Sequence, residues 1–314
     1  MKDKMRIFCC GSNPGLSESI AGELDMKLSP LEISRFSNDN LSVQIQENVR
    51  DRDVFVIQSL TTPVSEHLME MLITMDALRS SSAGRITAVI PYYSYARSDK
   101  KDAPRISITA RLIADLLKTA GADRVLTMDL HSAQVHGFFS MPVDHLTATY
   151  TIADYFRHYE NKENMIVVAT DAGGAKRAGR FAESLDAPIA IIDKRRISDT
   201  EVNQGELIGN VRGRDAVIFD DEIATGATIL ETIKTLKAAG VGKIYVSAVH
   251  PVLCGEAVSR LKKAGIEKLI VTNTVEITEE KLMKNMMVLS VAPLMAEAIR
   301  RIHTGESVGE LFPH

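Results

Sequence analysis

The sequence predicts an α/β protein with two similar halves, each a mostly parallel sheet flanked by helices. Three observations lead to this fold class. Short β-branched runs alternate with segments whose apolar residues recur at helical spacing. The chain has 314 residues and is 45% hydrophobic, which suits about two domains. One stretch of the first half is also echoed in the second half, which indicates an internal duplication.

The expected strands are short apolar runs that are separated by helix-length segments. Between them, apolar residues recur at helical spacing, as at Ile229, Ile233 and Leu236, so each helix packs one stripe on a sheet. In order, the expected strands comprise residues 6–10, 54–58, 86–91, 124–130, 165–170, 189–193, 216–219, 243–249 and 268–272.

The internal echo joins residues 117–131 with residues 236–250. Each copy reads as a helix end, an Ala-Gly cap, a strand and a final histidine, and the glycine supplies the left-handed cap position. Residues 88–90 are likewise echoed by residues 216–218, which makes the strand-to-helix loop of the first half the longer one. Chance is the alternative, because Ala-Gly helix ends are common.

Charge and composition exclude several classes of protein. The net charge of -4 and the lack of long Lys/Arg runs argue against nucleic-acid or membrane-surface partners. No apolar run is long enough for a membrane span or a signal segment. The three cysteines match no metal-ligand spacing and fit a reduced compartment, so we expect a cytoplasmic protein.

The strongest site pattern lies in the second half. Asp220 and Asp221 follow an expected strand, and Thr225-Gly226-Ala227-Thr228 then opens a helix. Gly226 lets the backbone approach a ligand, and the N–H groups of a helix start attract phosphate. Adjacent carboxylates at a strand's carboxyl end suit vicinal hydroxyls or Mg²⁺. The alternative is a capping turn with solvated acids. We interpret the pattern as a seat for a phosphoribosyl group.

The longer loop of the first half, residues 91–105, combines basic and acidic residues with three tyrosines. Such a composition suits a polyanionic ligand that carries an aromatic base. The Arg97 guanidinium is able to stack on the base or to donate paired hydrogen bonds to a phosphate. A merely solvated loop has the same charges.

Three further positions are candidate contacts. His131 ends an expected strand, where a packed or capping role is the alternative. Asp171 follows another strand and precedes two glycines, which fits a metal or sugar contact as well as a helix N-cap. The basic run Lys194-Arg195-Arg196 begins a polar stretch that could close over a triphosphate and stabilise transition-state charge, or simply be exposed.

Together these motifs resemble the ribose-phosphate pyrophosphokinase (phosphoribosyl-diphosphate synthetase, PRPP synthetase) family over essentially the whole chain. The resemblance implies two phosphoribosyltransferase-like domains. It also implies an Mg²⁺-dependent transfer of pyrophosphate from ATP to O1 of ribose 5-phosphate, which gives phosphoribosyl diphosphate and AMP. The motifs that carry it are residues 35–38, 95–97, 99–102, 128–131, 134–139, 171–177, 194–196 and 297–312.

The resemblance also assigns roles to residues. It implies a first domain at 1–146 with the ATP loop and a second at 147–314 with the ribose-phosphate loop, the C-terminal tail packing back on the first half. It further implies a homo-oligomer, a hexamer, with phosphate and ADP as candidate effectors. The implied ligands are Phe36, Asn38, Asn40, Arg97, Ser98, Asp99, Asp102 and His131 for ATP; His131 and Asp171 for metal; Lys194 and Arg196 for catalysis; and Asp220, Asp221, Thr225, Gly226, Ala227 and Thr228 for ribose 5-phosphate.

The sequence departs from the family pattern at several of these places. Ser98 replaces a usual glutamine and Asn40 a usual acid, so adenine contacts are expected to differ. Ala224 replaces an aspartate before the phosphate-loop threonine, which removes one expected ribose contact. Asn48 and Gly309 stand where serines are common at an effector site, so we expect only weak stimulation by phosphate.

Two other functions are alternatives to the one that this resemblance implies. A type I phosphoribosyltransferase shares the acid pair and the Thr-Gly-x-Thr loop, but it has no use for a second phosphate-binding half. A catalytically silent regulatory subunit of true synthetases would account for the departures, but it would not need the intact metal candidates or the catalytic candidates Lys194 and Arg196.

Overall fold

The computed structural model describes residues 4–159, 161–193 and 206–311. The chain divides into two compact units. Unit 1 comprises residues 1–147, 274–276 and 290–314, and unit 2 comprises residues 148–273 and 277–289. Both are α/β units with mostly parallel sheets, which confirms the predicted fold class.

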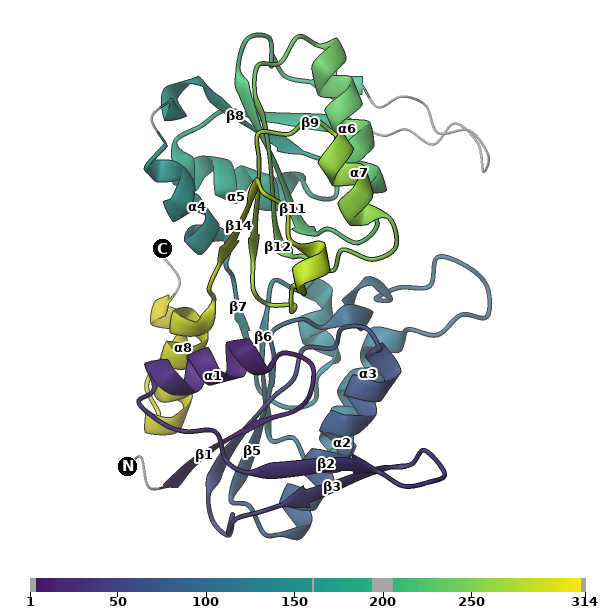
Figure 1. Ribbon diagram of the computed structural model, residues 1–314, viewed down its shortest axis with the longest axis vertical. Coiled ribbons are helices and arrows are strands. Elements are labelled where there is room, and N and C mark those ends of the chain that lie inside the picture. The colour runs from purple at the N-terminus through teal and green to yellow at the C-terminus, as the bar shows by residue number, and fades with distance from the viewer. Residues whose placement is uncertain (1–3, 160, 194–205, 312–314) are drawn as a thin grey trace. The chain divides into compact units, whose positions relative to one another are not determined.

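Unit 1 is built on a five-stranded sheet in the order β1-β4-β5-β6-β7, with every neighbouring pair parallel. Helices α2 and α3 lie on one side of the sheet, and α1 and α8 lie on the other (Figure 1). The strands are β1 (Met5–Cys9), β4 (Asp53–Ile57), β5 (Arg85–Ile90), β6 (Arg124–Met128) and β7 (Val143–Leu146), and the helices are α1 (Pro14–Glu23), α2 (Val64–Ser80), α3 (Thr109–Ala120) and α8 (Ala292–Thr304).

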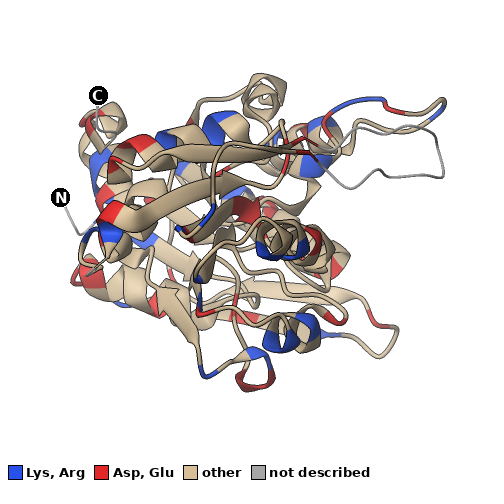
Figure 2. Cartoon of the chain, turned by 90° about the horizontal axis from the view of Figure 1, so that it is seen from above, with Lys and Arg blue, Asp and Glu red and all other residues tan. Residues whose placement is uncertain are grey.

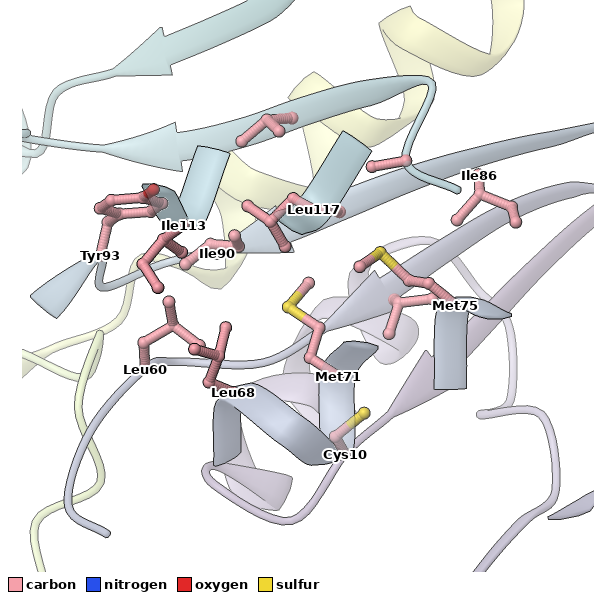
Figure 3. Packing of buried hydrophobic residues seen from close by; sticks show 14 of the residues in the cluster. Cys10, Leu60, Leu68, Met71, Met75, Ile86, Ile90, Tyr93, Ile113 and Leu117 are labelled. Carbon is pink, nitrogen blue, oxygen red and sulfur yellow. The ribbon is translucent and has the colours of Figure 1, made fainter. Parts of the chain in front are cut away.

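The core of unit 1 fills the space between its sheet and helices α2 and α3. Met71 and Met75 from α2 and Leu117 from α3 point towards the strands, and all three are fully buried (Figure 3). Ile90, at the end of β5, belongs to the same cluster. Because close packing fixes both helices on the sheet, it also fixes the two ends of the loop that joins β5 to α3.

An antiparallel hairpin, β2 (Leu31–Arg35) and β3 (Leu41–Ile45), forms a separate sheet of unit 1. It was not predicted, because its strands are half exposed and contain no continuous apolar run. It packs against α2 through β3.

Unit 2 is built on a seven-stranded sheet in the order β10-β9-β8-β11-β12-β13-β14, which is parallel except for β10. Helices α4 and α5 lie on one side, and α6 and α7 on the other (Figure 1). The strands are β8 (Met165–Ala169), β9 (Ile189–Asp193), β10 (Glu206–Ile208), β11 (Asp215–Glu222), β12 (Ile244–His250), β13 (Lys268–Thr272) and β14 (Met286–Leu289), and the helices are α4 (Thr149–Arg157), α5 (Ala175–Leu185), α6 (Ala227–Ala238) and α7 (Ala257–Lys263).

The repeated segment forms the same elements in both units. Gly121 ends α3 and Gly240 follows α6, and both have a positive φ, of 116° and 78°. The loop before the helix differs, because residues 91–108 join β5 to α3 whereas only residues 223–226 join β11 to α6. Short 3-10 helices occupy the connections at Ser94–Arg97, Ala133–Phe138, Lys162–Asn164, Glu279–Lys281 and Val308–Leu311.

Charged residues of both signs are interspersed along the elements of each unit (Figure 2). Among the residues that the structure describes, no helix is both long enough and apolar enough to cross a bilayer.

Candidate functional site

The predicted acid pair lies at the carboxyl end of a central strand of unit 2. Asp220 and Asp221 were expected to follow the strand, but β11 continues through both to Glu222, because it keeps pairing with β12 as far as His250. The Asp221 side chain is only 3% exposed, and that of Asp220 is mostly buried. Strand geometry, rather than a loop, therefore fixes the backbone of the pair.

Arg177, near the start of α5, bridges the two carboxylates. Its Nη1 atom donates to Oδ1 of Asp221 at 2.7 Å and to Oδ1 of Asp220 at 3.2 Å. The hydroxyl of Thr170 donates to Oδ2 of Asp220 at 2.9 Å. The backbone N–H of Asp221 completes the set by donating to Oδ1 of Asp220 at 2.9 Å. Charge-assisted hydrogen bonds of this kind hold both acids in one arrangement.

The pKa of Asp220 is raised from its ordinary value. Burial is the main cause, because it disfavours the charged carboxylate, and the hydrogen bond and charge of Asp221 add to it. Arg177 and the Thr170 hydroxyl act in the opposite direction. Burial and Asp221 thus favour the protonated form of Asp220, and the Arg177 guanidinium opposes this shift in pKa.

The phosphate loop follows directly after the acid pair. Gly226 precedes α6 with φ of 73°, a left-handed conformation that disfavours other residues. Helix α6 then begins at Ala227. Its N-cap residue, Gly226, has no side chain to cap the helix, and the N–H of Ala227 donates to the Thr225 hydroxyl at a long 3.5 Å. Thr225, Ala227 and Thr228 are exposed. The loop therefore presents backbone donors and two hydroxyls, which suits a phosphate.

Neighbouring segments brace this loop by its carbonyl oxygens. The N–H of Leu253 donates to the oxygen of Ile223 at 2.8 Å, and that of Cys254 donates to the oxygen of Ala224 at 3.0 Å. Arg260 of α7 donates to the oxygen of Thr225 at 3.2 Å. Ala224, which departs from the family pattern, thus contributes its backbone to the bracing.

The longer loop of unit 1 is held mainly through its first part, at Tyr95 and Ser98. Ser98 N donates to the oxygen of Tyr95 at 2.9 Å, and Ala110 N donates to the oxygen of Ser98 at 3.2 Å. The Arg97 and Asp102 side chains are exposed, whereas Ser98 and Asp99 are partly buried. The loop thus holds its first part against α3 and turns Arg97 outward.

The tip of the β2–β3 hairpin carries the other expected ATP contacts. Phe36 is 61% exposed, which is unusual for so large an apolar side chain. The turn is closed by the N–H of Phe36, which donates to the oxygen of Asn40 at 2.9 Å, and Asn38 Oδ1 accepts from the N–H of Asn40 at 3.3 Å. The hairpin tip and the loop at Arg97 project from different places on unit 1 (Figure 1).

The remaining candidates are distributed over both units. His131 is exposed just beyond the end of β6 in unit 1. Asp171 is exposed just beyond the end of β8 in unit 2, where its Oδ1 accepts from the N–H of Gly174 at 2.8 Å. Lys194 and Arg196 lie outside the described residues.

Sequence reasoning missed Arg177 and Thr170 as partners of the acid pair. Both belong to the segment that contains Asp171, and β8 pairs with β11, so adjacent strand ends bring them to Asp220. A Lys-Arg pair at a helix start was the available signal, but its partners are more than forty residues away in the chain.

Known proteins match nearly the whole length of this chain. A family model described as the N-terminal domain of ribose phosphate pyrophosphokinase matches residues 5–121, and one described as a phosphoribosyl synthetase-associated domain matches residues 201–313. Ribose-phosphate pyrophosphokinase of Deinococcus radiodurans is 47% identical over 315 residues, covering 99% of this chain and 98% of that protein. The corresponding protein of Caldanaerobacter subterraneus is 47% identical over 310 residues, covering 99% and 98%.

A solved structure agrees with the sequence matches. The crystal structure of phosphoribosylpyrophosphate synthetase from Mycobacterium smegmatis superimposes with a TM-score of 0.92 at 40% identity, covering 96% of this chain and 99% of that one. Because these relatives match nearly the whole chain at 40% to 47% identity, the chain belongs to the ribose-phosphate pyrophosphokinase family.

Proposed function

We propose that the chain transfers the pyrophosphoryl group of ATP to O1 of ribose 5-phosphate and releases AMP. The acid pair followed by a helix that starts at a left-handed glycine in unit 2 is the observation that carries this proposal. It offers acceptors for sugar hydroxyls beside donors for a phosphate, which are the two ends of ribose 5-phosphate. We infer the second substrate, ATP, from the membership of the chain in this family.

The sugar phosphate occupies the seat in unit 2. Thr225, Gly226, Ala227 and Thr228 bind the 5-phosphate through backbone N–H groups and hydroxyls at the positive end of α6. Asp220 and Asp221 accept hydrogen bonds from the ribose hydroxyls. Holding both ends of the substrate fixes the direction of O1, and fixed direction is a large part of catalysis in phosphoryl-group transfer.

ATP is bound by residues of unit 1. Arg97 binds the phosphates with its guanidinium fork, and its neighbours Ser98, Asp99 and Asp102 complete the loop. His131 contributes from the end of β6. Phe36, Asn38 and Asn40 of the hairpin tip serve ATP as well, and the exposed ring of Phe36 offers a stacking face to an adenine.

Magnesium is the expected cofactor, and Asp171 and His131 are the residues that would hold it. Asp171 fits, because Mg²⁺ prefers carboxylate oxygens and commonly uses one or two of them together with substrate phosphates and water. Among the described residues, no three His, Cys, Asp or Glu side chains form a cluster that could hold a metal ion. When bound, the ion neutralises phosphate charge.

Lys194 and Arg196 are assigned to the transition state. Two cations over the transferred group offset the negative charge that develops as AMP leaves. The assembly is expected to be a homo-oligomer, a hexamer by family resemblance, with phosphate and ADP as candidate effectors and the cytoplasm as its compartment.

Product analysis tests this function. The purified chain with ATP, Mg²⁺ and ribose 5-phosphate is expected to release AMP in proportion to the phosphoribosyl diphosphate formed. A reaction without ribose 5-phosphate serves as the control for ATP hydrolysis. Pyrophosphate release from phosphoribosyl diphosphate and a nucleobase, without AMP, would instead establish a phosphoribosyltransferase. No AMP from a folded chain would favour a silent regulatory subunit.

A further inference from the structure

The acid pair of unit 2 has a different electrostatic environment from the other acid at the same sheet edge. Asp220 and Asp221 share one guanidinium, that of Arg177, through the contacts described above. In the part of the chain that the structure describes, Asp171 forms no ion pair and is exposed. One sheet edge therefore carries an acid pair whose charge is partly neutralised by a guanidinium and a single acid that has no ion pair among the described residues.

This difference decides what each acid is able to bind. A divalent cation prefers carboxylates whose charge is not already balanced, because it must replace its own hydration shell. Neutral hydroxyl groups need acceptor oxygens with fixed directions but bring no charge. A guanidinium beside two carboxylates lowers the attraction for a cation while leaving acceptors for hydroxyls.

We propose that Arg177 is a positioning residue that reserves the Asp220–Asp221 pair for the ribose hydroxyls and keeps divalent cations off it. This inference rests on the proposed function for the identity of the sugar. The metal is thereby directed to Asp171, the acid at this edge that lacks a cationic partner among the described residues. The two acids at adjacent strand ends, β8 and β11, thus take different ligands.

The geometry supports positioning as well as charge compensation. Arg177 Nη1 contacts Oδ1 of each acid, and the Thr170 hydroxyl contacts Oδ2 of Asp220, so the rotation of the Asp220 carboxylate is fixed from both sides. The Arg177 side chain is itself only 21% exposed, which limits alternative positions for its guanidinium. Burial raises the pKa of Asp220 and Arg177 lowers it, so removal of the arginine favours a proton or another cation on the pair.

Three variants test the proposal in binding measurements without ATP. Arg177→Met removes the charge, Arg177→Lys keeps the charge but loses the planar guanidinium, and Arg180→Ala removes an exposed arginine from the same helix as the matched control. Ribose 5-phosphate binding is measured by isothermal titration calorimetry, and Mn²⁺ binding by electron paramagnetic resonance.

The expected pattern differs for each variant. Arg177→Met weakens ribose 5-phosphate binding roughly 10- to 100-fold, as for loss of charge-assisted hydrogen bonds. It also gains about one weak Mn²⁺ ion per chain, since two uncompensated carboxylates suit that ion. Arg177→Lys recovers part of the affinity and gains no Mn²⁺, and Arg180→Ala matches the wild type in both.

Unchanged sugar affinity in Arg177→Met, or no gain of Mn²⁺, would overturn the inference. If Arg177→Met does not fold, Arg177→Lys decides: a ribose 5-phosphate affinity equal to that of the wild type would exclude a positioning role for the guanidinium. Because neither measurement uses ATP, these results stay separate from the AMP assay, whose failure would count against the proposed reaction alone.

Discussion

The two strand-to-helix loops of this chain differ in length and in how they are held. In unit 2, residues 223–226 are braced through the carbonyl oxygens of Ile223, Ala224 and Thr225. In unit 1, residues 91–108 are held chiefly near Tyr95 and Ser98, and the charged residues that follow are exposed.

We therefore expect the loop of unit 2 to be a preformed binding site and the loop of unit 1 to be an adaptable one. A short braced loop has its ligand geometry before the ligand arrives, so little entropy is lost on binding. A long loop with exposed charges must be ordered by its ligand, and long loops commonly carry such functions. We therefore expect changes in the unit 2 loop to affect affinity through backbone geometry and changes in the unit 1 loop to act through single charges.

The largest loss of turnover is expected from substitutions outside both loops, at Lys194 and Arg196. Lys194→Ala and Arg196→Ala are each expected to lower kcat roughly 100- to 1000-fold, as for other groups that act on developing charge. Ribose 5-phosphate binding should stay near the wild-type value, because the proposed site for this substrate comprises residues 220–228. Rapid-quench AMP formation and calorimetry measure the two quantities, and near-normal turnover would remove both residues from the mechanism.

Arg97→Ala should raise the KM for ATP roughly 10- to 100-fold, the cost of a lost charge-assisted contact to phosphate. Its exposed side chain predicts little change in Tm. Lys118→Ala, an exposed cation on the following helix α3, is the matched control. An equal rise in KM for both variants would mean that the loop acts only through general charge.

Asp220→Asn should weaken ribose 5-phosphate binding about tenfold yet raise Tm at pH 8. An acid whose folded pKa is raised lowers stability as pH rises from its ordinary value, near 4, through the folded value. The gain in Tm should therefore shrink as pH falls towards about 4. Differential scanning calorimetry measures Tm across this pH range, and Glu183→Gln on the exposed face of α5 is the control. A gain in Tm that does not change with pH would contradict the assignment.

Gly226→Ala should have the smallest effect, a loss of about 1–2 kcal/mol from the left-handed backbone. There is room for a methyl group, since its nearest neighbour, Ala257, is 3.8 Å away. Gly305→Ala is the control, because Gly305 has a similar φ of 77° and open space around it but lies at the end of α8. Both variants should lose similar stability in urea denaturation, while only Gly226→Ala weakens the sugar phosphate; weakening in neither would show that the loop is not a preformed seat.

The central strands of both sheets could be predicted because burial on both faces gives them continuous apolar sequences. Each expected strand is present, with ends displaced by a few residues. The hairpin β2–β3 and the edge strands β7, β10 and β14 were missed, since they are short or half exposed and pattern alone does not distinguish them from loops.

The site was predicted where its residues are consecutive. The acid pair and residues 225–228 form one run, so strand and helix signals located them. The roles assigned to individual site residues stay predictions. The bridge from Arg177 could not be foreseen, because it depends on the pairing of β8 with β11, which the sequence does not specify locally.

The last helix, α8, has a consequence for how the protein is made. It packs on α1, its Met295, Ile299 and Ile302 are buried, and His303 Nδ1 lies 2.6 Å from Oδ2 of Asp53 in β4. A ribosome completes the N-terminal residues first, and domains tend to fold as they emerge. One face of the first sheet therefore has only α1 on it until residues 292–304 have left the ribosome.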